Sequence, residues 1–470
     1  MRRRTHWAGA VFIVVALISA AIVAVATIAA AITPPRDPDP TWQTVGEFER
    51  NGKNPTGRVW AIQYGHGASA GKVFVAGNFT EVKPPLGQPG GQVTRLGLMA
   101  LDVASGDLIT SFSPDFTLTD GTAQVRSLAL SPDGSKLYVG GLFTHVDGLS
   151  RPRLTEIDTT TGAVGAWKPN PFAAVNALEL NSDGTVLYAG GHFKKVKGIE
   201  RNLIAAFDMT NNGSLMQNWH PQITQVMPLD CPGRCWPTVL GLDLSPDEST
   251  LYISGSFAWV DGIPRNNVAA VSATTGAVRP FDPNVLTLGF APSMNIISEI
   301  AATDERVYFC GDFWALGTGP DRHPSPNLAG VDPITGRYDA SWVATTDGGT
   351  NDCAVVGDAL VVGGHFEYAG GEHAGPAPDG TGVYRQHVAA ISLSDGSVQS
   401  WNPNANSASG LYAIGSSPTK LGIGGDFLKI NFQDQAGFGQ FSLGSDTVAP
   451  TRPGQPSGVS NSPSTIDLTW

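Results

Sequence analysis

The chain is poor in charged residues and in cysteine. Only 15% of its 470 residues are Asp, Glu, Lys or Arg, whereas glycine (57) and proline (34) are abundant. This balance provides many turns and few long surface helices, as in an all-β protein. The formal net charge is -12, and no cluster of Lys or Arg follows the first few residues. The basic face that a nucleic acid requires is therefore missing, and we expect no nucleic-acid partner.

Familiar catalytic patterns are also missing. The sequence contains no Gly-x-Ser-x-Gly, no His-Glu-x-x-His and no phosphate-binding glycine loop. Acidic pairs of the kind that glycoside hydrolases use are present, for example Glu299 with Asp304 and Asp347 with Asp352. Proximity along the chain says little about separation in space, so these pairs carry almost no signal. The sequence favours a chain without a catalytic centre.

The four cysteines allow three pairings in an exported chain. Cys231 and Cys235 lie in one loop, so a local disulfide is the economical choice. Cys310 and Cys353 fall on strands of neighbouring copies of the repeat described below, and we predict a second disulfide between them. A zinc site needs a second pair of ligands at suitable spacing, and none accompanies the first pair.

The N-terminus indicates export. Arg2, Arg3 and Arg4 precede an uncharged stretch from Trp7 to Ile32, which is about as long as a membrane-spanning helix. Small residues at 29–31 also fit a cleavage site, so residues 1–32 are either a signal peptide or an uncleaved helical anchor. In both cases the remainder lies outside the cytoplasm. Residues 33–40 form a proline-rich spacer.

A short phrase, glycine, one variable residue and phenylalanine, recurs through the chain, each time after a β-branched or aromatic run. Such periodic recurrence is typical of a repeat architecture. The seven copies are Gly77-Asn78-Phe79, Gly141-Leu142-Phe143, Gly191-His192-Phe193, Gly255-Ser256-Phe257, Gly311-Asp312-Phe313, Gly364-His365-Phe366 and Gly425-Asp426-Phe427.

Each copy predicts four short antiparallel strands joined by reversals. The clearest copy runs from Val125 to Asn170, with a hairpin turn at 131–134 and a tryptophan, Trp167, in its fourth strand. Seven such sheets packed radially predict a seven-bladed β-propeller over residues 41–445. The seventh copy lacks a tryptophan strand, so we predict that an N-terminal strand at Thr41–Val45 completes the last blade.

The C-terminal segment differs from the repeats. Residues 446–453 read as a linker, and Ser464–Trp470 alternates like a strand of a fibronectin type III module. Residues 446–470 contain about two strands of such a module, too few to bury a core. We interpret them as a truncated beginning of one.

The repeats resemble the delta-sixty repeat propellers of secreted actinobacterial proteins over roughly residues 41–443. An aspartate, a Thr-Gly pair and then a tryptophan, as in Asp158 to Trp167, are also similar to the docking motif of quinoprotein propellers, although Ser272 and Ser392 replace the aspartate in two copies. The first resemblance implies a secreted propeller. The second implies pyrroloquinoline quinone with calcium as an alternative to having no cofactor.

Candidate binding residues lie toward one face. Insertions at 83–94, 222–238, 285–294, 317–326 and 368–386 all fall on connections expected at the same end of the sheets. Binding sites often develop on such inserted loops. The variable residue of the repeated phrase lies near this end, and two tryptophans there are suited to stacking on sugars. The candidate ligand-binding residues are His192, Asp312, His365, Asp426, Trp236 and Trp314.

Two classes of function follow from the sequence. The favoured one is an extracytoplasmic binding or scaffold protein that recognises a polysaccharide, a cell-wall polymer or a protein partner through the inserted face. The alternative is a secreted enzyme, either a glycoside hydrolase or a quinoprotein-type oxidoreductase. Contact with the membrane is expected only through the N-terminal segment.

Overall fold

The computed structural model describes residues 34–45, 57–224, 237–286, 296–372, 374–375, 380–407, 409–443, 457–462 and 465–469. This part of the chain is all-β, as predicted. Its helical pieces are three short 3-10 turns, η1 (Gly67–Ser69), η2 (Met209–Asn211) and η4 (Gly319–Asp321). No helix within the described ranges is long and apolar enough to span a bilayer. The predicted signal or anchor at 1–32 falls outside these ranges.

Seven antiparallel sheets, numbered here 1 to 7 in chain order, account for most of the strands. Each has three strands in sequential order, and sheet 3 has a fourth. Sheets 1 to 4 are β2 (Val59–Tyr64), β3 (Lys72–Gly77) and β6 (Leu98–Asp102); β8 (Gln124–Leu130), β9 (Lys136–Leu142) and β12 (Leu154–Asp158); β13 (Val175–Leu180), β14 (Val186–Gly191), β17 (Ile204–Asp208) and β18 (Ser214–Leu215); and β20 (Thr238–Leu244), β21 (Thr250–Ser256) and β24 (Val268–Ser272). Sheets 5 to 7 are β26 (Ile296–Ala302), β27 (Val307–Asp312) and β30 (Leu328–Val331); β31 (Thr350–Val356), β32 (Ala359–Gly364) and β35 (Val388–Ser392); and β36 (Leu411–Ser416), β37 (Lys420–Gly425) and β40 (Phe438–Ser442).

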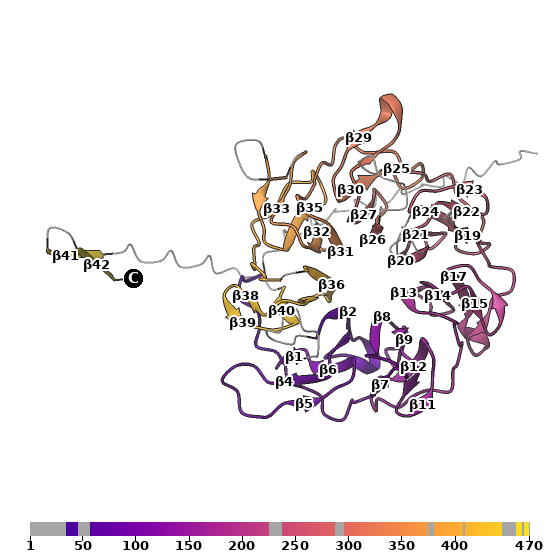
Figure 1. Ribbon diagram of the computed structural model, residues 1–470, viewed down its shortest axis with the longest axis horizontal. Coiled ribbons are helices and arrows are strands. Elements are labelled where there is room, and N and C mark those ends of the chain that lie inside the picture. Colours follow the sequence, from indigo (N-terminus) through magenta and orange to yellow (C-terminus); the bar gives the residue numbers. More distant parts are fainter. Residues whose placement is uncertain are drawn as a thin grey trace, which may run out of the picture.

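The seven sheets follow one another around a common centre, with their first strands innermost (Figure 1). Each first strand contacts the first strand of the next sheet, and β36 of sheet 7 contacts β2 of sheet 1. The hydrophobic core is correspondingly divided into seven clusters, each drawn from two neighbouring sheets. The cluster that joins sheets 7 and 1 contains Val59, Met99, Ala413 and Phe438. The first and last repeats therefore pack against each other directly.

The repeated phrase has a physical reason. A Cβ atom on Gly141 would lie 2.1 Å from the carbonyl oxygen of Gln124, so only glycine allows this approach of the second strand to the start of the first. The amide of Gly141 donates to the carbonyl of Arg153, and the amide of Arg153 donates to the carbonyl of Phe143, whose side chain is fully buried. Glycine and phenylalanine in this phrase therefore serve the scaffold.

The predicted fourth strand is much reduced. Only sheet 3 of the described chain has one, β18, and in other sheets the segment that carries the tryptophan makes a single bridge, such as Ile157 with Val164 or Val331 with Tyr338. The tryptophan itself provides the attachment. Trp342 of sheet 5 is 1% exposed, and its indole nitrogen donates to the carbonyl oxygen of Ser392 in sheet 6 at 2.8 Å. Burial of a large ring and one hydrogen bond replace a strand ladder here.

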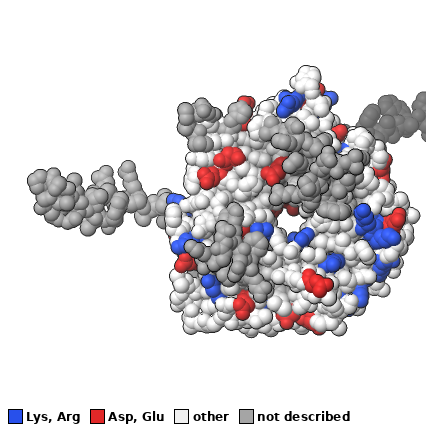
Figure 2. Space-filling view, viewed as in Figure 1, with Lys and Arg blue, Asp and Glu red and all other residues white. Residues whose placement is uncertain are grey.

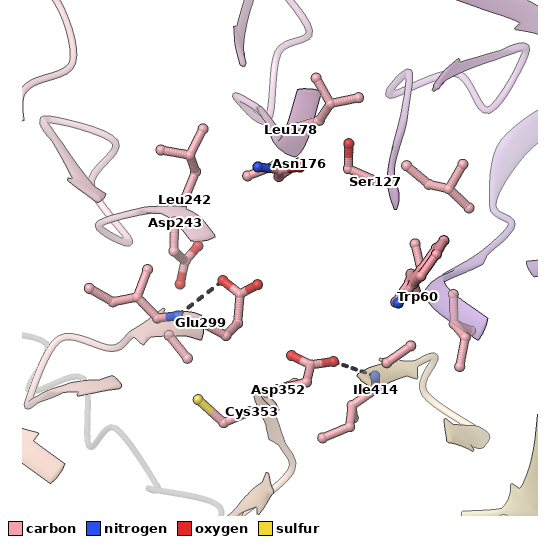
Figure 3. Close-up of a pocket in the computed structure, with 18 of the residues that line it drawn as sticks. Trp60, Ser127, Asn176, Leu178, Leu242, Asp243, Glu299, Asp352, Cys353 and Ile414 are labelled. Atoms are coloured by element: carbon pink, nitrogen blue, oxygen red, sulfur yellow. Dashed lines mark hydrogen bonds between the residues drawn. The ribbon is translucent and has the colours of Figure 1, made fainter. Parts of the chain in front are cut away.

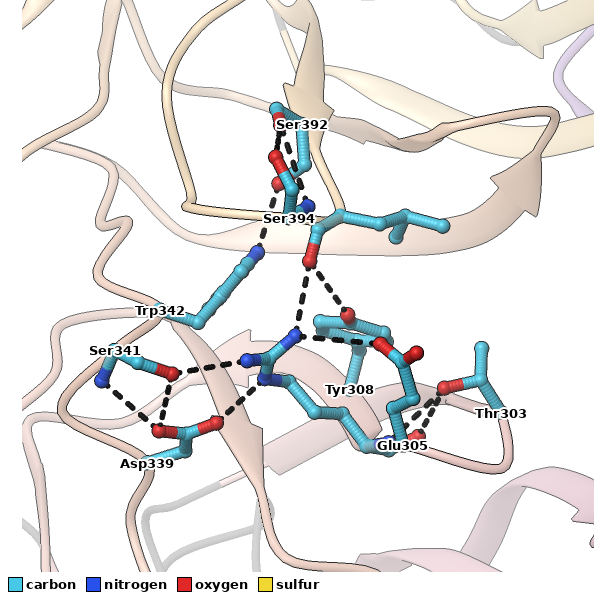
Figure 4. Close-up of polar contacts among 10 residues, drawn as sticks. Thr303, Glu305, Tyr308, Asp339, Ser341, Trp342, Ser392 and Ser394 are labelled. Carbon is cyan, nitrogen blue, oxygen red and sulfur yellow. Dashed lines mark hydrogen bonds and ion pairs between the residues drawn. The ribbon is translucent and has the colours of Figure 1, made fainter. Parts of the chain in front are cut away.

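Polar contacts reinforce the same junction between sheets 5 and 6 (Figure 4). The guanidinium of Arg306 forms an ion pair with Asp339 at 2.6 Å and donates to the carbonyl oxygen of Leu393 at 3.0 Å. The ring of Tyr308 contacts that of Trp342 at 4.9 Å between centroids. The region between these two sheets is thus occupied by contacts that fix one sheet against the next.

The N-terminal segment joins the two ends of the repeat array, but not with the predicted pairing. Strand β1 (Gln43–Val45) pairs with β4 (Glu81–Lys83) of the first copy, so its assignment to the last blade was wrong. Residue Asp39, which precedes the predicted strand, instead bridges Gln440 of sheet 7. This single bridge lies at the fourth-strand position, as in most of the other copies, and the chain then runs on to the first copy.

Side chains hold this N-terminal segment in place. The indole nitrogen of Trp401 donates to the carbonyl oxygen of Pro35 at 3.2 Å. Lys420 forms an ion pair with Asp39 at 2.7 Å, and the side chain of Gln435 donates to the hydroxyl of Thr41 at 2.9 Å. Residues 35–41 therefore make the contacts to sheet 7 that a following copy would otherwise make.

Small hairpins lie outside the main sheets. The segment that leaves one sheet pairs with the hairpin between the second and third strands of the next, so both kinds of connection lie at the same end of the sheets. Further strands of these hairpins are β5 (Val93–Thr94), β7 (Phe116–Thr117), β10 (His145–Val146), β11 (Leu149–Ser150), β15 (Lys195–Val196), β16 (Ile199–Glu200), β19 (Ile223–Thr224), β22 (Trp259–Val260), β23 (Ile263–Pro264), β25 (Val285–Leu286), β28 (Ala315–Leu316), β29 (His323–Pro324), β33 (Tyr368–Ala369), β34 (Val383–Tyr384), β38 (Lys429–Ile430) and β39 (Gln433–Asp434).

The C-terminal segment contains a separate hairpin. Strand β41 (Ser457–Ser462) pairs antiparallel with β42 (Thr465–Thr469). Two paired strands in this position agree with the two strands expected there from the sequence.

Candidate functional site

The inner edges of the first strands line a central cavity. Its volume is about 370 Å³, and strands from all seven sheets contribute to its wall. Figure 2 shows an opening at the centre of the ring, with charged side chains of both signs around it. A cavity of this size is within the range that small-molecule sites occupy. It is therefore the first place to look for a ligand site.

A β-bulge at the same place in every first strand shapes this wall. After the first paired residues of each first strand, one extra residue has no partner on the second strand. Bulges redirect side chains and are frequent beside functional sites. The seven extra residues are Trp60, Arg126, Asn176, Leu240, Ser298, Asn351 and Tyr412.

One wall of the cavity is acidic. Asp243 of β20, Glu299 of β26 and Asp352 of β31 project toward the central space (Figure 3). Asp243 accepts the amide of Ala302 at 2.6 Å, and Asp352 accepts the amide of Ile414 at 2.5 Å. Each of these two carboxylates thus bonds to the first strand of the next sheet. They satisfy amides at an inner sheet edge that would otherwise lack partners.

Removal from bulk water changes the ionisation of these carboxyl groups. Burial raises the pKa of Asp243 and of Asp352 to about 7, although backbone amides favour the charged form of each. The pKa of Glu299 is raised well above its ordinary value, first by burial and then by the charge of Asp352. The pKa of Glu179, farther along β13, is raised by burial and by Asp243. Near neutral pH this wall is partly protonated and offers both donors and acceptors.

The opposite wall is aromatic and basic. Trp60 lies across the cavity from the acidic residues (Figure 3). The guanidinium carbon of Arg126 is 5.8 Å from the centre of its ring, and that of Arg58 is 6.0 Å away. Arg58 also lies 4.2 Å from the ring centre of Tyr412 and forms an ion pair with Asp426 at 3.3 Å. The cavity therefore combines an aromatic face with hydrogen-bonding groups of both charges.

The structure places the variable residues of the repeated phrase at the ends of the second strands, near the beginnings of the first. Asp426 is held by Arg58 and by Ser407. His365 accepts the amide of Gly349 at 3.1 Å, and Asp312 lies beside the same glycine. These side chains bond locally. No group of three or more His, Cys, Asp or Glu side chains in the described ranges is arranged to hold a metal.

His192 lies closer to the basic wall. Burial lowers its pKa, and the charge of Arg126 lowers it further. Of the predicted ligand-binding residues that the structure describes, His192 thus neighbours a residue of the cavity wall, Arg126.

Of the two candidate tryptophans the structure describes Trp314, and Trp259 is a further tryptophan of the small hairpins. Trp314 is half-buried, and its amide donates to the carbonyl of Leu286. Trp259, in β22, is also half-buried. Neither lines the central cavity. Trp236 lies outside the described residues, as do Cys231 and Cys235.

The predicted bridge between Cys310 and Cys353 is absent. Both cysteines are free and buried, in the cluster that joins sheets 5 and 6. Burial raises the pKa of both thiols. Neighbouring strands bring the two residues together as expected, but a shared hydrophobic cluster places them there without a covalent bond.

Sequence reasoning named two residues of the cavity wall, Glu299 and Asp352, but in the wrong pairs. It paired Glu299 with Asp304 and Asp347 with Asp352, whereas the structure places Glu299 close enough to Asp352 for their charges to interact. Alignment of the seven first strands on their bulges reveals this relation, because Glu299 and Asp352 both follow the bulged residue directly. Trp60 and Arg126 occupy the bulge itself.

Comparison with protein-family models found no match for this chain, and comparison with curated proteins found no relative of significant similarity.

Proposed function

We propose that the chain is an extracytoplasmic, seven-bladed β-propeller that binds a saccharide in its central cavity. The observation that carries the proposal is the cavity of about 370 Å³ with Trp60 on one wall and three carboxyl groups on the other. An aromatic ring suits the apolar face of a sugar, and partly protonated carboxyl groups suit its hydroxyls. The ring of seven sheets and the resemblance to secreted repeat propellers support the fold assignment, and the sequence of the N-terminus supports export.

The hydrogen bonds of the carboxyl groups favour a binding function over a catalytic one. Asp243 and Asp352 each bond to a backbone amide of the next sheet, which fixes their positions. A fixed polar wall favours recognition because little side-chain freedom is lost when a ligand binds. In this view the repeats form a rigid frame, and the inner edges supply the specificity.

A screen of the full chain against a glycan array tests the proposal, followed by Trp60→Ala. We expect specific binding to a subset of glycans and a loss of affinity of about 10-fold in the variant, because the stacking surface is removed. Trp259→Ala removes a half-buried tryptophan outside the cavity and serves as the matched control. Binding that is unchanged in the Trp60 variant would contradict the cavity as the site.

The acidic wall supports a second candidate, a glycoside hydrolase. Such enzymes need one carboxyl group that keeps its proton near neutral pH and acts as the acid, and burial raises the pKa of Asp243 and of Asp352 to about 7. Reducing-end assays on the glycans that bind distinguish the two functions. Turnover that is lost in Glu299→Gln while binding persists would establish the enzyme, and binding without turnover would leave the binding protein.

A further inference from the structure

One basic residue of the cavity has only neutral partners. The Nη1 group of Arg126 donates to the amide oxygen of Asn176 at 2.7 Å, and its Nε and Nη2 groups donate to the amide oxygen of Gln124 at 3.0 and 2.5 Å. These three bonds leave two of the five N–H groups of a guanidinium without a partner among the described residues. No carboxylate of the described chain lies within ion-pair distance of Arg126.

Arg153 provides a second positive charge nearby. One of its nitrogens, Nη1, is buried without a hydrogen-bond partner, and the described residues offer it no ion pair. Its charge is close enough to lower the pKa of Arg126 further, after burial. Its backbone is left-handed, with φ of 69°. The same position is glycine in two copies, Gly97 and Gly437, where this conformation costs nothing.

Arg58, whose guanidinium carbon is 6.0 Å from the centre of the Trp60 ring, is an arginine of this region that does have an anionic partner. It has an ion pair with Asp426 and an aromatic partner in Tyr412. Two neighbouring guanidinium groups without an anion are costly when they are removed from water. The contrast indicates that Arg126 and Arg153 lack a partner that Arg58 already has.

We propose that Arg126 and Arg153 bind the carboxylate of an acidic saccharide, whose sugar ring lies against Trp60. This inference deepens the proposed function and rests on it. A guanidinium matches the planar geometry of a carboxylate with two parallel hydrogen bonds. The guanidinium carbon of Arg126 lies 5.8 Å from the centre of the Trp60 ring, so one ligand can contact both residues. The protonated carboxyl groups of the opposite wall then face its hydroxyls.

Binding of the full chain to a matched set of oligosaccharides tests the inference. The set comprises a trisaccharide that ends in glucuronic acid, its methyl ester, the counterpart that ends in glucose, and a sulfated form of that counterpart. We expect the acid to bind about 10- to 100-fold more tightly than the ester and the neutral counterpart. Arg126→Gln is expected to remove this advantage, so that the variant binds the acid no more tightly than it binds the ester.

Two further variants separate charge from geometry and from folding. Arg126→Lys keeps the charge but loses the planar fork, so an intermediate affinity for the acid is expected. Lys168→Gln removes an exposed positive charge of sheet 2 away from the cavity and is expected to bind like the unaltered chain. Arg153→Gln should reproduce the effect of Arg126→Gln, with thermal unfolding recorded to show that both variants fold.

The outcomes distinguish a failure of the carboxylate site from a failure of the proposed saccharide binding. Equal affinity for the acid, the ester and the neutral sugar would overturn the carboxylate site and leave saccharide binding intact. Sulfated sugar that binds as tightly as the acid would replace the carboxylate by a sulfate as the recognised group. No binding by any member of the set and no hit on the glycan array would overturn the proposed function and this inference together.

Discussion

The junctions between sheets use residues that recur from copy to copy, whereas the inner edges of the same sheets use residues that differ. Junctions reuse one solution, in which a ring from one sheet is buried against the next, as with Trp219 at Ser272 and Trp342 at Ser392. Inner edges share a bulge at one position but carry a different residue there in almost every copy, from Trp60 to Arg126 to Leu240. The repeats are constant where they hold together and variable where they face the central space.

This difference is the reason for placing the proposed function at the inner edges. A residue that recurs in several copies with the same contact is explained by the scaffold, because one physical need repeats around the ring. Trp60 and Arg126 do not recur in this way. Among the described first strands, acidic residues occur in sheets 3 to 6. The residues that do not recur therefore form two walls that face each other across one cavity, one basic and aromatic, the other acidic. The recurring residues hold the sheets together, and the residues that do not recur give the cavity its polar and aromatic groups.

The largest effect is expected from Trp342→Ala, which removes a buried ring from the junction between sheets 5 and 6. The indole is 1% exposed and donates to the carbonyl oxygen of Ser392 at 2.8 Å, so its loss leaves a large cavity and removes one of the two hydrogen bonds to that oxygen, which still accepts the amide of Gly396. We expect a loss of about 3–5 kcal/mol in the free energy of unfolding, measured by denaturant titration. Trp259→Ala, at a half-buried hairpin position, should cost less than half as much. Equal losses would contradict the distinct role assigned to the junctions.

The repeat was predictable because local geometry dictates its residues. Gly141 must be glycine to pass the carbonyl of Gln124, and a turn such as that at Asp332 needs a side chain that accepts the amide of Thr335. Such needs recur in each copy and appear directly in the sequence. The fourth strand was overestimated because a buried tryptophan and a single bridge suffice to attach that segment, and a sequence pattern does not distinguish a bridge from a ladder.

The cavity was less predictable because its residues meet only through the closure of the ring. Glu299 and Asp352 lie in different copies and interact because consecutive first strands stand side by side. Residues near each other in sequence, such as Glu299 and Asp304, gave the wrong pairing. Polar residues in the repeated phrase attracted attention because they recur, yet His365 and Asp426 are bonded to nearby groups. Recurrence indicates structure more reliably than function in this chain.

A smaller effect is expected in the pH dependence of the free energy of unfolding. The pKa of Asp352 is raised to about 7 in the fold, so the folded state holds its proton more tightly than the unfolded chain does. Ionisation of Asp352 therefore destabilises the folded state. This destabilisation is absent below the ordinary pKa of 3.8, grows as the pH rises and is complete above about 7. Between pH 6.5 and pH 8 this carboxyl should lower the free energy of unfolding by about 1 kcal/mol.

Comparison of unfolding at these two pH values in Asp352→Asn measures that contribution together with the effect of Asp352 on Glu299, whose pKa its charge raises. The asparagine keeps an oxygen that accepts the amide of Ile414 but cannot ionise, so the variant should lose less stability than the unaltered chain when the pH is raised from 6.5 to 8.

Asp332→Asn is the matched control. Hydrogen bonds from Thr335 lower the pKa of Asp332, so its contribution is present above its ordinary value and disappears only as pH falls below that range. The histidines with lowered pKa values, His192 and His387, act in the opposite sense, mainly below pH 6.5, and remain unchanged in all three proteins. An unchanged pH response in the Asp352 variant would show that the acidic wall is solvated like an ordinary surface, and the cavity would then lose its distinction from the rest of the scaffold.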